Sequence, residues 1–233
     1  MKKIFLFFLL AFSTATGNAQ GRQPVTIVTF GNSTTAPRKG VQKVYAQRLH
    51  EKLDSMGITN TVINSGVPSS HSGSIRDNSF AKVIHAMDRF DTAVLKYHPN
   101  WVTINFGLND AYQDKGQGTS SRIPLKQFQK NIRYFIRQIE RQGGQVILLT
   151  PNPLGSRFEQ FRYERVKAYA NAIRKIAKRK HLPLIDSWLL FYNYADALHQ
   201  PIDVLFTDSI HPNDTGHQLI ATALSQIIGG QQR

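Results

Sequence analysis

The sequence predicts an α/β fold, a three-layer α/β/α sandwich around a mainly parallel, five-stranded sheet. Short apolar runs alternate along the chain with longer segments whose apolar residues recur at helical spacing. Strands joined by helices need right-handed crossovers, which favours a parallel sheet covered on both faces. The chain has 233 residues and no internal repeat or linker, so we expect one domain after the N-terminal segment.

Five segments have the composition of buried strands, since they are short, apolar and rich in β-branched residues. The first ends at Gly31, the second at Ser65-Gly66 and the third at Gly107. The predicted strands are 25–30, 61–64, 101–106, 145–150 and 184–185.

Helices are predicted between these strands. The clearest is 123–142, because its apolar residues fall on one face and Gly143-Gly144 ends it. That inner face comprises Phe128, Ile132, Phe135, Ile136 and Ile139. The other predicted helices are 41–56, a segment between 79 and 97 with a break near Asp91, 159–180 and 214–228.

The first nineteen residues have the pattern of a signal peptide. Lys2 and Lys3 precede an apolar run at 4–12, and Gly17-Asn18-Ala19 supplies the small residues of a cleavage site. Cleavage after Ala19 would leave residues 20–233 as an exported protein, periplasmic or secreted. The alternative is a retained N-terminal anchor, but the run is shorter than an ordinary membrane span.

The amino-acid composition limits the classes of protein and of active site that are possible. Hydrophobic residues make up 41% of the chain and charged residues 19%, as in globular proteins. There is no cysteine, which excludes disulfides, thiolate metal sites and a cysteine nucleophile.

The chain is strongly basic, with a formal net charge of +14. Six basic residues are three or four positions apart, which would align them along one helical face. They are Arg122, Lys126, Lys130, Arg133, Arg137 and Arg141. This stripe could bind an acidic glycan, an anionic membrane or nucleic acid, or it could be a solvated surface. Nucleic acid is not expected, because no aromatic residues interleave with the stripe.

Polar residues follow the first three predicted strands. Ser33 follows the first, Gly66 the second and Asn109 the third. Parallel sheets bind ligands beyond the carboxyl ends of their strands, so this edge is the expected site.

Four segments, in this order, resemble the blocks of the SGNH (GDSL-like) hydrolases. They are Phe30-Gly31-Asn32-Ser33-Thr34-Thr35, Asn64-Ser65-Gly66, Gly107-Leu108-Asn109-Asp110 and Asp208-Ser209-Ile210-His211. In turn they resemble the family's Gly-Asp-Ser block, its glycine block, its Gly-x-Asn-Asp block and its Asp-x-x-His block. The resemblance implies a flavodoxin-like arrangement of the sheet and the activity of a serine esterase.

The chemistry fits these residue types. A serine hydroxyl such as that of Ser33 needs a base, here His211, and Asp208 is close enough to orient the imidazole. The resemblance assigns the oxyanion donors to the N–H groups of Ser33 and Gly66 and to the side-chain amide of Asn109. Two residues depart from the family pattern. Asn32 replaces the usual aspartate, and Ser69 replaces a glycine found in many members.

Each assignment has a simpler alternative. Ser33 could cap a turn, Gly66 could end a strand, and Asn109 could form a turn. Asp208 could likewise cap a turn, and His211 could be a surface residue. Asp110 is interpreted as a turn former.

The preferred function is hydrolysis of carboxylic esters, most naturally O-acetyl groups on a polysaccharide or oligosaccharide. Arg38 and His71 are weaker candidates for substrate binding. The alternatives are a lipase or lysophospholipase of the same mechanism, a non-catalytic protein that binds acidic glycans, and a phosphate-ester hydrolase. No cofactor or catalytic metal is expected, because no Walker, dinucleotide-binding or His-Glu-x-x-His pattern occurs.

Overall fold

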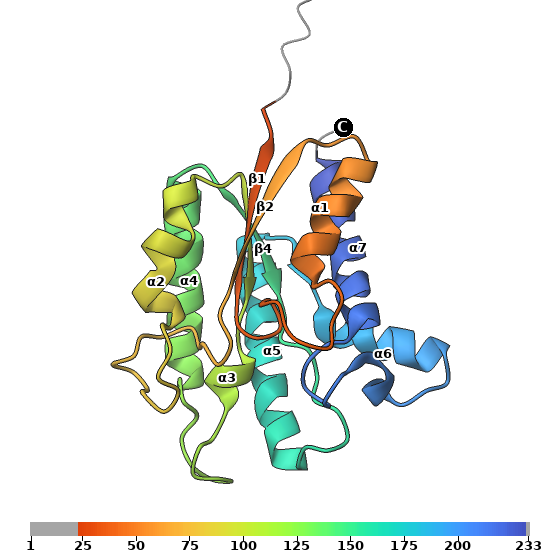
Figure 1. Ribbon diagram of the computed structural model, residues 1–233. Coiled ribbons are helices and arrows are strands. Elements are labelled where there is room, and N and C mark those ends of the chain that lie inside the picture. The colour runs from red at the N-terminus through yellow and green to blue at the C-terminus, as the bar shows by residue number, and fades with distance from the viewer. Residues whose placement is uncertain (1–22, 232–233) are drawn as a thin grey trace, which may run out of the picture.

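The computed structural model describes residues 23–231, which form a parallel five-stranded sheet between two layers of helices (Figure 1). The strand order is β2-β1-β3-β4-β5. The strands are β1 (Val25–Gly31), β2 (Asn60–Gly66), β3 (Trp101–Asn105), β4 (Gln145–Leu149) and β5 (Leu184–Ile185). The predicted fold class and all five strands are confirmed. The predicted signal peptide lies outside the described residues.

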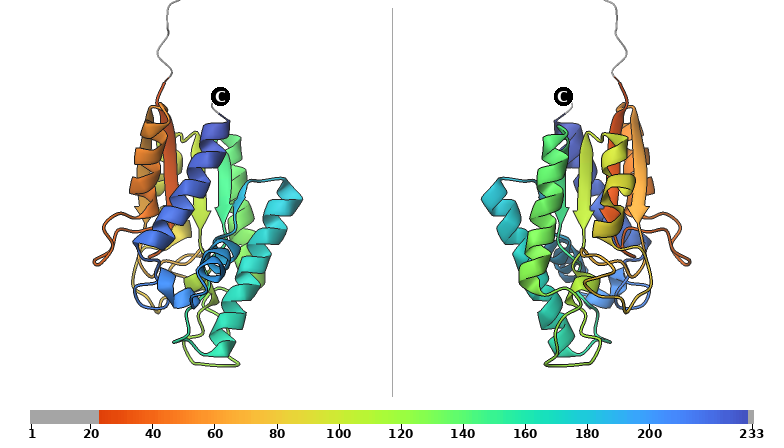
Figure 2. Two further views of the ribbon diagram at one scale, coloured as in Figure 1. Left: turned by 90° about the vertical axis from the view of Figure 1, so that its right-hand side faces the viewer. Right: turned by 90° about the vertical axis from the view of Figure 1, so that its left-hand side faces the viewer.

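Two helical layers cover the sheet. One face packs against α2 (Ala86–Ala93), α4 (Leu125–Arg141) and α5 (Gln160–Lys180). The other packs against α1 (Tyr45–Ser55), α6 (Ser187–Ala197) and α7 (Asp214–Gly230). Figure 2 shows the two layers from opposite sides, with α1 and α7 on the side that faces the viewer in the left panel and α2 and α4 on the side that faces the viewer in the right panel. A short helix, α3 (Leu108–Ala111), and two 3₁₀ turns, Leu95–Tyr97 and Ile202–Leu205, complete the structure.

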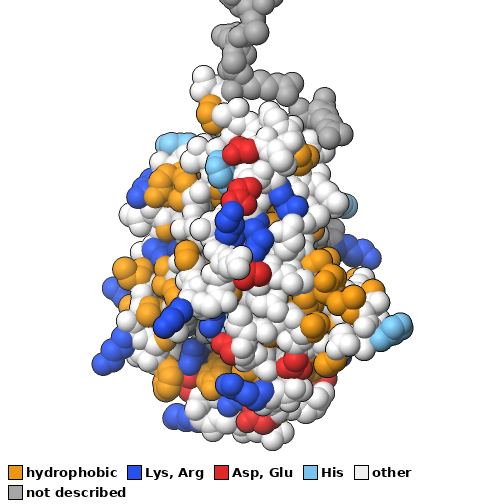
Figure 3. Space-filling view, turned by 45° about the vertical axis from the view of Figure 1, so that its right-hand side comes forward, with side chains coloured by type: hydrophobic (Ala, Val, Ile, Leu, Met, Phe, Trp, Pro, Cys, Tyr) orange, Lys and Arg blue, Asp and Glu red, His pale blue; other side chains and the backbone are white. Residues whose placement is uncertain are grey.

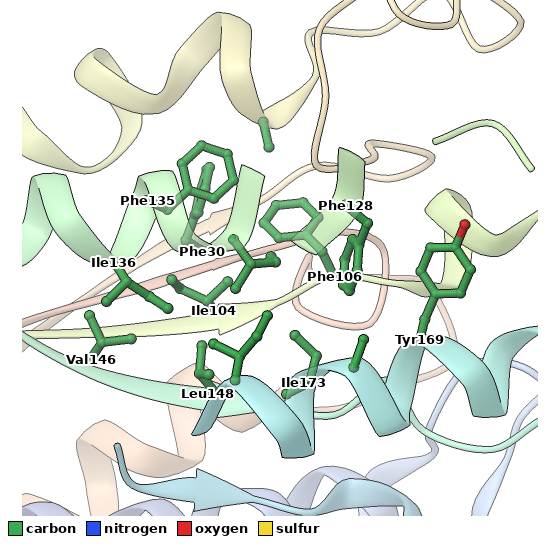
Figure 4. Packing of buried hydrophobic residues seen from close by; sticks show 14 of the residues in the cluster. Phe30, Ile104, Phe106, Phe128, Phe135, Ile136, Val146, Leu148, Tyr169 and Ile173 are labelled. Carbon is green, nitrogen blue, oxygen red and sulfur yellow. The ribbon is translucent and has the colours of Figure 1, made fainter. Parts of the chain in front are cut away.

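The core beneath α4 and α5 is rich in aromatic residues. Phe128 and Phe135 of α4 are fully buried, as the helical periodicity predicts. Phe30 of β1 lies 5.4 Å from Phe135 between ring centroids, in an edge-to-face contact (Figure 4). Tyr169 of α5 packs 5.0 Å from Phe128 and donates a hydrogen bond from its hydroxyl to the Ile123 carbonyl, at 2.5 Å. This packing fixes both helices against the sheet.

Helix boundaries differ from the sequence prediction at a few points. The helix expected between 79 and 97 is shorter, because residues 79–84 form no helix and α2 ends at Ala93, before the 3₁₀ turn. Two helices, α3 and α6, are not predicted. The segment 187–191 of α6 is almost entirely apolar, so it lacks the polar face that marks an amphipathic helix. Its start is nevertheless capped, since the Asp186 carboxylate accepts the Leu189 N–H at 3.2 Å.

Both ends of the described chain lie at the same edge of the sheet. β1 begins at Val25, and α7 ends at Gly230, on the same edge of the sheet, at the top of Figure 1. The carboxyl ends of the strands lie at the opposite edge. Among the described residues no helix combines the length and apolar character that crossing a bilayer requires.

Candidate active site

A tight turn after β1 brings Ser33 to the carboxyl edge of the sheet. The Asn32 carbonyl accepts hydrogen bonds from the N–H groups of Thr35 and Ala36, at 3.1 and 3.0 Å. The turn is close to the strand, because a Cβ on Gly31 would lie 2.1 Å from the Thr35 hydroxyl oxygen. Ser33 is half-buried and is the second residue of this turn.

Asn32 supports the turn without a charge. Its side-chain oxygen accepts the Thr34 N–H at 3.0 Å and the Thr34 hydroxyl at 2.8 Å. Asn105, at the end of β3, donates its amide to the same hydroxyl at 3.1 Å. An asparagine therefore supplies the acceptor that shapes this turn.

Ser33, His211 and Asp208 form one hydrogen-bonded chain. The Ser33 Oγ lies 2.9 Å from His211 Nε2. His211 Nδ1 lies 2.8 and 3.0 Å from the two Asp208 carboxylate oxygens. Because the carboxylate accepts a hydrogen bond from the Nδ1–H, Nε2 carries no hydrogen and is free to accept the serine proton.

The segment that carries Asp208 and His211 is held by its own backbone. Thr207 N–H donates to the His211 carbonyl at 2.9 Å, and an antiparallel bridge joins Phe206 to Pro212. Ser209 between them has a φ of 62°, in the left-handed region. Its carbonyl accepts the Gly155 N–H at 2.7 Å, which ties the turn to the loop after β4.

The surroundings set the charge of both ionisable groups. Burial alone would raise the pKa of Asp208, but the N–H and Nδ1 of His211, together with Arg38, lower that pKa to about 2. Burial lowers the pKa of His211, and Arg38 lowers it further, against the opposing effect of the Asp208 hydrogen bond. Near neutral pH the aspartate is therefore ionised and the histidine neutral.

Arg38, predicted as a substrate contact, lies against Asp208. One of its terminal nitrogens (Nη2) donates to the carboxylate at 3.1 Å. Its Nε is buried without a hydrogen-bond partner among the described residues. No local sequence pattern indicates this ion pair, because the two residues are 170 positions apart.

A second group of residues, here called the donor side, comprises Ser69, Ser70 and Asn109. Asn109 donates one side-chain hydrogen to the Ser70 carbonyl at 3.1 Å and keeps a second for another acceptor. Ser69 is exposed with a φ of 62°, and within residues 23–231 its N–H makes no hydrogen bond. The N–H of Ser33 is likewise uncommitted in that part of the chain.

Gly66 has a different setting from the one expected. Its N–H already donates to the Asn64 side-chain oxygen at 2.9 Å. A Cβ at this position would lie 2.3 Å from the Ala36 nitrogen, so the residue must be glycine for the two backbones to pack. The structure thus brings Ser69 and Asn109 together through Ser70 and leaves the Gly66 amide engaged elsewhere.

Asp110 anchors the donor side, a role that the sequence did not reveal. It is fully buried, and its two oxygens accept the N–H groups of Ser72 at 2.8 Å and Gly107 at 3.0 Å. Burial raises the pKa of Asp110 to about 6. These bonds join the loop after β2 to the start of α3, which carries Asn109.

His71 belongs to the loop after β2, and its side chain is buried. Its ring stacks on His85 with centroids 3.5 Å apart. Nε2 lies 3.1 Å from the Asn78 carbonyl, and Nδ1 accepts the Gly73 N–H at 3.2 Å. Neither ring nitrogen is left to contact a substrate, so His71 supports the loop, in contrast to the expected substrate contact.

A small apolar pocket lies beside the site. Leu108 and Ile210, which line it, directly precede Asn109 and His211 in the chain, and Leu154 closes one side. Its volume of about 20 Å³ is little more than one water molecule requires. No cluster of three or more metal-binding side chains occurs within residues 23–231.

A family model matches most of the chain. The model of the GDSL-like lipase/acylhydrolase family covers residues 29–219, from β1 to α7, and so includes all four blocks. The chain belongs to this family. Membership makes the protein a GDSL-like esterase or acylhydrolase, a carboxylic ester hydrolase by class.

Curated relatives of this acylhydrolase are distant. The chain is 29% identical over 213 residues to an uncharacterised lipoprotein, YqeF, of Bacillus subtilis, with 82% of this chain and 81% of the relative covered. It is 22% identical over 143 residues to an acetylxylan esterase of Geobacillus stearothermophilus, with 60% of this chain and 64% of that protein covered.

Solved structures share the fold. A lipase/acylhydrolase from Enterococcus faecalis superposes with a TM-score of 0.71 at 25% identity, covering 89% of this chain and 96% of that one. An acetylxylan esterase from Geobacillus stearothermophilus, Axe2, has a TM-score of 0.70 at 20% identity, covering 88% and 94%.

Proposed function

We propose that this acylhydrolase is an exported serine esterase that removes O-acetyl groups from carbohydrate. The observation that carries the mechanism is the hydrogen-bonded chain from Ser33 through His211 to Asp208, with 2.9 and 2.8 Å between the atoms. Ser33 is the nucleophile, His211 the general base and acid, and Asp208 the group that orients the imidazole.

The reaction proceeds in two steps. Ser33 Oγ attacks the ester carbonyl and its proton passes to His211 Nε2, which then protonates the leaving alcohol as the ester C–O bond breaks. A water molecule, deprotonated by the same nitrogen, attacks the acyl-enzyme. This attack releases the carboxylic acid, and His211 returns the proton to the Ser33 oxygen.

The negative oxygen of each tetrahedral intermediate needs hydrogen-bond donors. We assign the Ser33 N–H and the free side-chain hydrogen of Asn109, as the family resemblance implies. For the third donor we assign the Ser69 N–H in place of that of Gly66, because the Gly66 N–H is bonded to Asn64 and that of Ser69 is exposed and unbonded among the described residues.

The acetyl preference rests on the pocket beside the site. The pocket of about 20 Å³ bounded by Leu108, Leu154 and Ile210 has room for a methyl group, which favours an acetyl ester over one with a long acyl chain. The likeness to acetylxylan esterases makes a sugar hydroxyl the favoured carrier of the ester. Export follows from the predicted signal peptide at residues 1–19.

The test is hydrolysis of p-nitrophenyl acetate, butyrate and octanoate, and of acetylated xylan, by protein beginning at Gln20. Ser33→Ala should lose at least ~10³-fold in kcat, because no nucleophile replaces the hydroxyl. Activity should fall from acetate to octanoate. Equal or faster octanoate turnover would indicate a lipase, and turnover that survives Ser33→Ala would refute the mechanism.

A further inference from the structure

The positive charge of this protein is concentrated in two neighbouring helices. α4 and α5 together carry thirteen Lys and Arg residues and two Glu, a net charge of +11, while the whole chain has +14. The opposite layer, α1, α6 and α7, has two basic and four acidic residues, a net charge of −2. The two faces of the sheet therefore differ strongly in electrostatic potential.

On the α1 and α7 side the charges neutralise one another. Arg48 pairs with Asp214, and Lys43 with Glu51. Figure 3 views this side of the molecule, where basic and acidic side chains lie next to each other. Such pairs leave little net field for a charged partner.

On the other side most basic residues have no carboxylate within 4 Å among residues 23–231. Arg133 is half-buried, and within residues 23–231 its side chain donates one hydrogen bond, to the side-chain oxygen of Gln129. The remaining unpaired residues of α4 are exposed: Lys126, Lys130, Arg137 and Arg141. On α5 the unpaired residues are Arg165, Lys175, Lys178 and Arg179. We call these nine residues the basic face.

Arg122, which the sequence pattern placed at the head of the stripe, is not part of it. It pairs with Asp114 at 2.7 Å and lies over the rings of Phe80 and Tyr112. Its charge is therefore neutralised locally, and the free stripe on α4 begins at Lys126.

The α4 part of the basic face is a straight row. Its five residues, spaced from Lys126 to Arg141, span about 22 Å of helix. The row starts at the active-site edge, because the Ile123 N–H, just before α4, donates to the Asp110 carbonyl of α3 at 3.1 Å. A linear polymer lying along α4 would thus have one end close to Asn109.

The types of side chain on the basic face distinguish between three possible polyanions: a membrane surface, a nucleic acid and an acidic polysaccharide. None of the large, exposed hydrophobic side chains lies on α4 or α5, so within the described residues these helices offer nothing to insert into a bilayer. Their aromatic residues are all buried or half-buried, so neither helix offers a fully exposed ring on which nucleic-acid bases could stack. The basic face therefore presents a row of positive charges, which is complementary to a hydrophilic polymer that bears regularly spaced anionic groups.

We propose that the basic face binds an acidic polysaccharide, one carrying uronate carboxylates or sulfates, and holds it beside the active site. Binding itself depends only on the charges of α4 and α5. The further statement that this polymer carries the ester cleaved at Ser33 rests on the proposed function. The interaction should weaken steeply with salt, because exposed charges are screened over about 10 Å at 0.1 M ionic strength.

The test compares two matched triple variants. One is Lys126→Gln, Lys130→Gln and Arg137→Gln, on the basic face. The other is Arg76→Gln, Lys82→Gln and Lys96→Gln, three exposed residues outside α4 and α5 that lose the same charge. Affinity for polygalacturonate is measured from 20 to 300 mM NaCl, beside neutral dextran and vesicles of phosphatidylglycerol and phosphatidylcholine. Hydrolysis of p-nitrophenyl acetate is measured in parallel.

We expect salt-sensitive binding to polygalacturonate and none to dextran. The α4 variant should lose at least tenfold in affinity and the control variant less than twofold, with ester hydrolysis unchanged in both. Equal losses in the two variants would overturn the proposal, as would binding to vesicles but not to polygalacturonate. Binding that depends on α4 in a protein without Ser33-dependent turnover would preserve the binding site and refute the esterase.

Discussion

The two sides of the proposed active site are built in different ways. On the Ser33–His211–Asp208 side, side chains bond to side chains at 2.8 to 3.0 Å, and the carboxylate also accepts the His211 N–H at 2.9 Å. On the donor side, Asn109 makes one bond to Ser70, while the Ser69 N–H has no partner in the described chain. On the first side all the described hydrogen bonds are formed without a substrate, whereas on the second side some N–H donors have no acceptor until a substrate binds.

This difference has a chemical reason. A base must already be oriented before the serine proton can move, so its bonds belong to the resting protein. Donors for a developing negative oxygen must be unsatisfied until that oxygen forms, and they are held in place by neighbours. Here Asp110 supplies that support through the N–H groups of Ser72 and Gly107. The backbone of the donor side is therefore held by hydrogen bonds to Asp110, while the donors themselves stay available for the oxyanion.

The largest effect in this comparison should come from Asn109→Ala, which removes a donor from the donor side. The kcat for p-nitrophenyl acetate should fall about 10²–10³-fold with KM changed little, because the amide acts on the transition state. Asn100→Ala, at the opposite edge of the sheet, is the control and should leave kcat unchanged. A loss below about fivefold for Asn109→Ala would mean that the donor side is assigned to the wrong residue.

An intermediate effect should follow from Arg38→Gln, on the serine–histidine side. The positive charge of Arg38 lowers the pKa of His211, so its removal should raise that pKa. Since only the neutral imidazole accepts the serine proton, the acidic limb of the kcat/KM profile should move to higher pH. Activity should then fall mainly below neutrality and stay close to normal at pH 8.

The matched control is Arg48→Gln, which breaks a comparable ion pair, with Asp214, away from Ser33. Its acidic limb should coincide with that of the unmodified protein. If Arg38→Gln lowers activity by one factor at every pH, Arg38 acts by positioning Asp208 and not through the charge state of His211.

The smallest effect should come from Ser69→Gly. The variant keeps the N–H on the donor side, so kcat should stay within about twofold. Glycine accepts the φ of 62° more readily than serine, and the free energy of unfolding should rise by roughly 0.5–1 kcal/mol, measured by urea denaturation. A large loss of kcat would show that the Ser69 hydroxyl takes part, and Ser69→Ala would then lose as much.

Much of the fold follows from local patterns. The strands and the long helix α4 were predicted within about two residues, because a buried parallel strand and an amphipathic helix each have a distinctive period. α6 was missed because its apolar residues do not occupy one face. The helix expected between 79 and 97 was too long, since 79–84 is fixed by side-chain contacts such as that between His85 and the Ala81 carbonyl.

The site was predictable where it depends on sequence blocks and not where it depends on distant contacts. Ser33, Asp208 and His211 could be selected together because the blocks that contain them occur in the order found in the family. The structure joins the three by hydrogen bonds, and their catalytic roles stay a proposal. The contact between Arg38 and Asp208 spans 170 residues and leaves no local pattern. The setting of Gly66 likewise depends on how Ala36 packs against it. Contacts of this kind, between residues far apart in the chain, can be seen only in the three-dimensional structure.

The two ends of the described chain lie on the edge of the sheet opposite Ser33. β1 alone, with seven residues, separates Val25 from the active-site edge by about 20 Å. A support, label or fused domain attached at either of these ends would therefore lie on the side of the molecule opposite Ser33. The edge of the sheet that carries Ser33 would still face the solvent. An immobilised molecule could therefore act on an insoluble polymer, because its attachment would not lie between the polymer and Ser33.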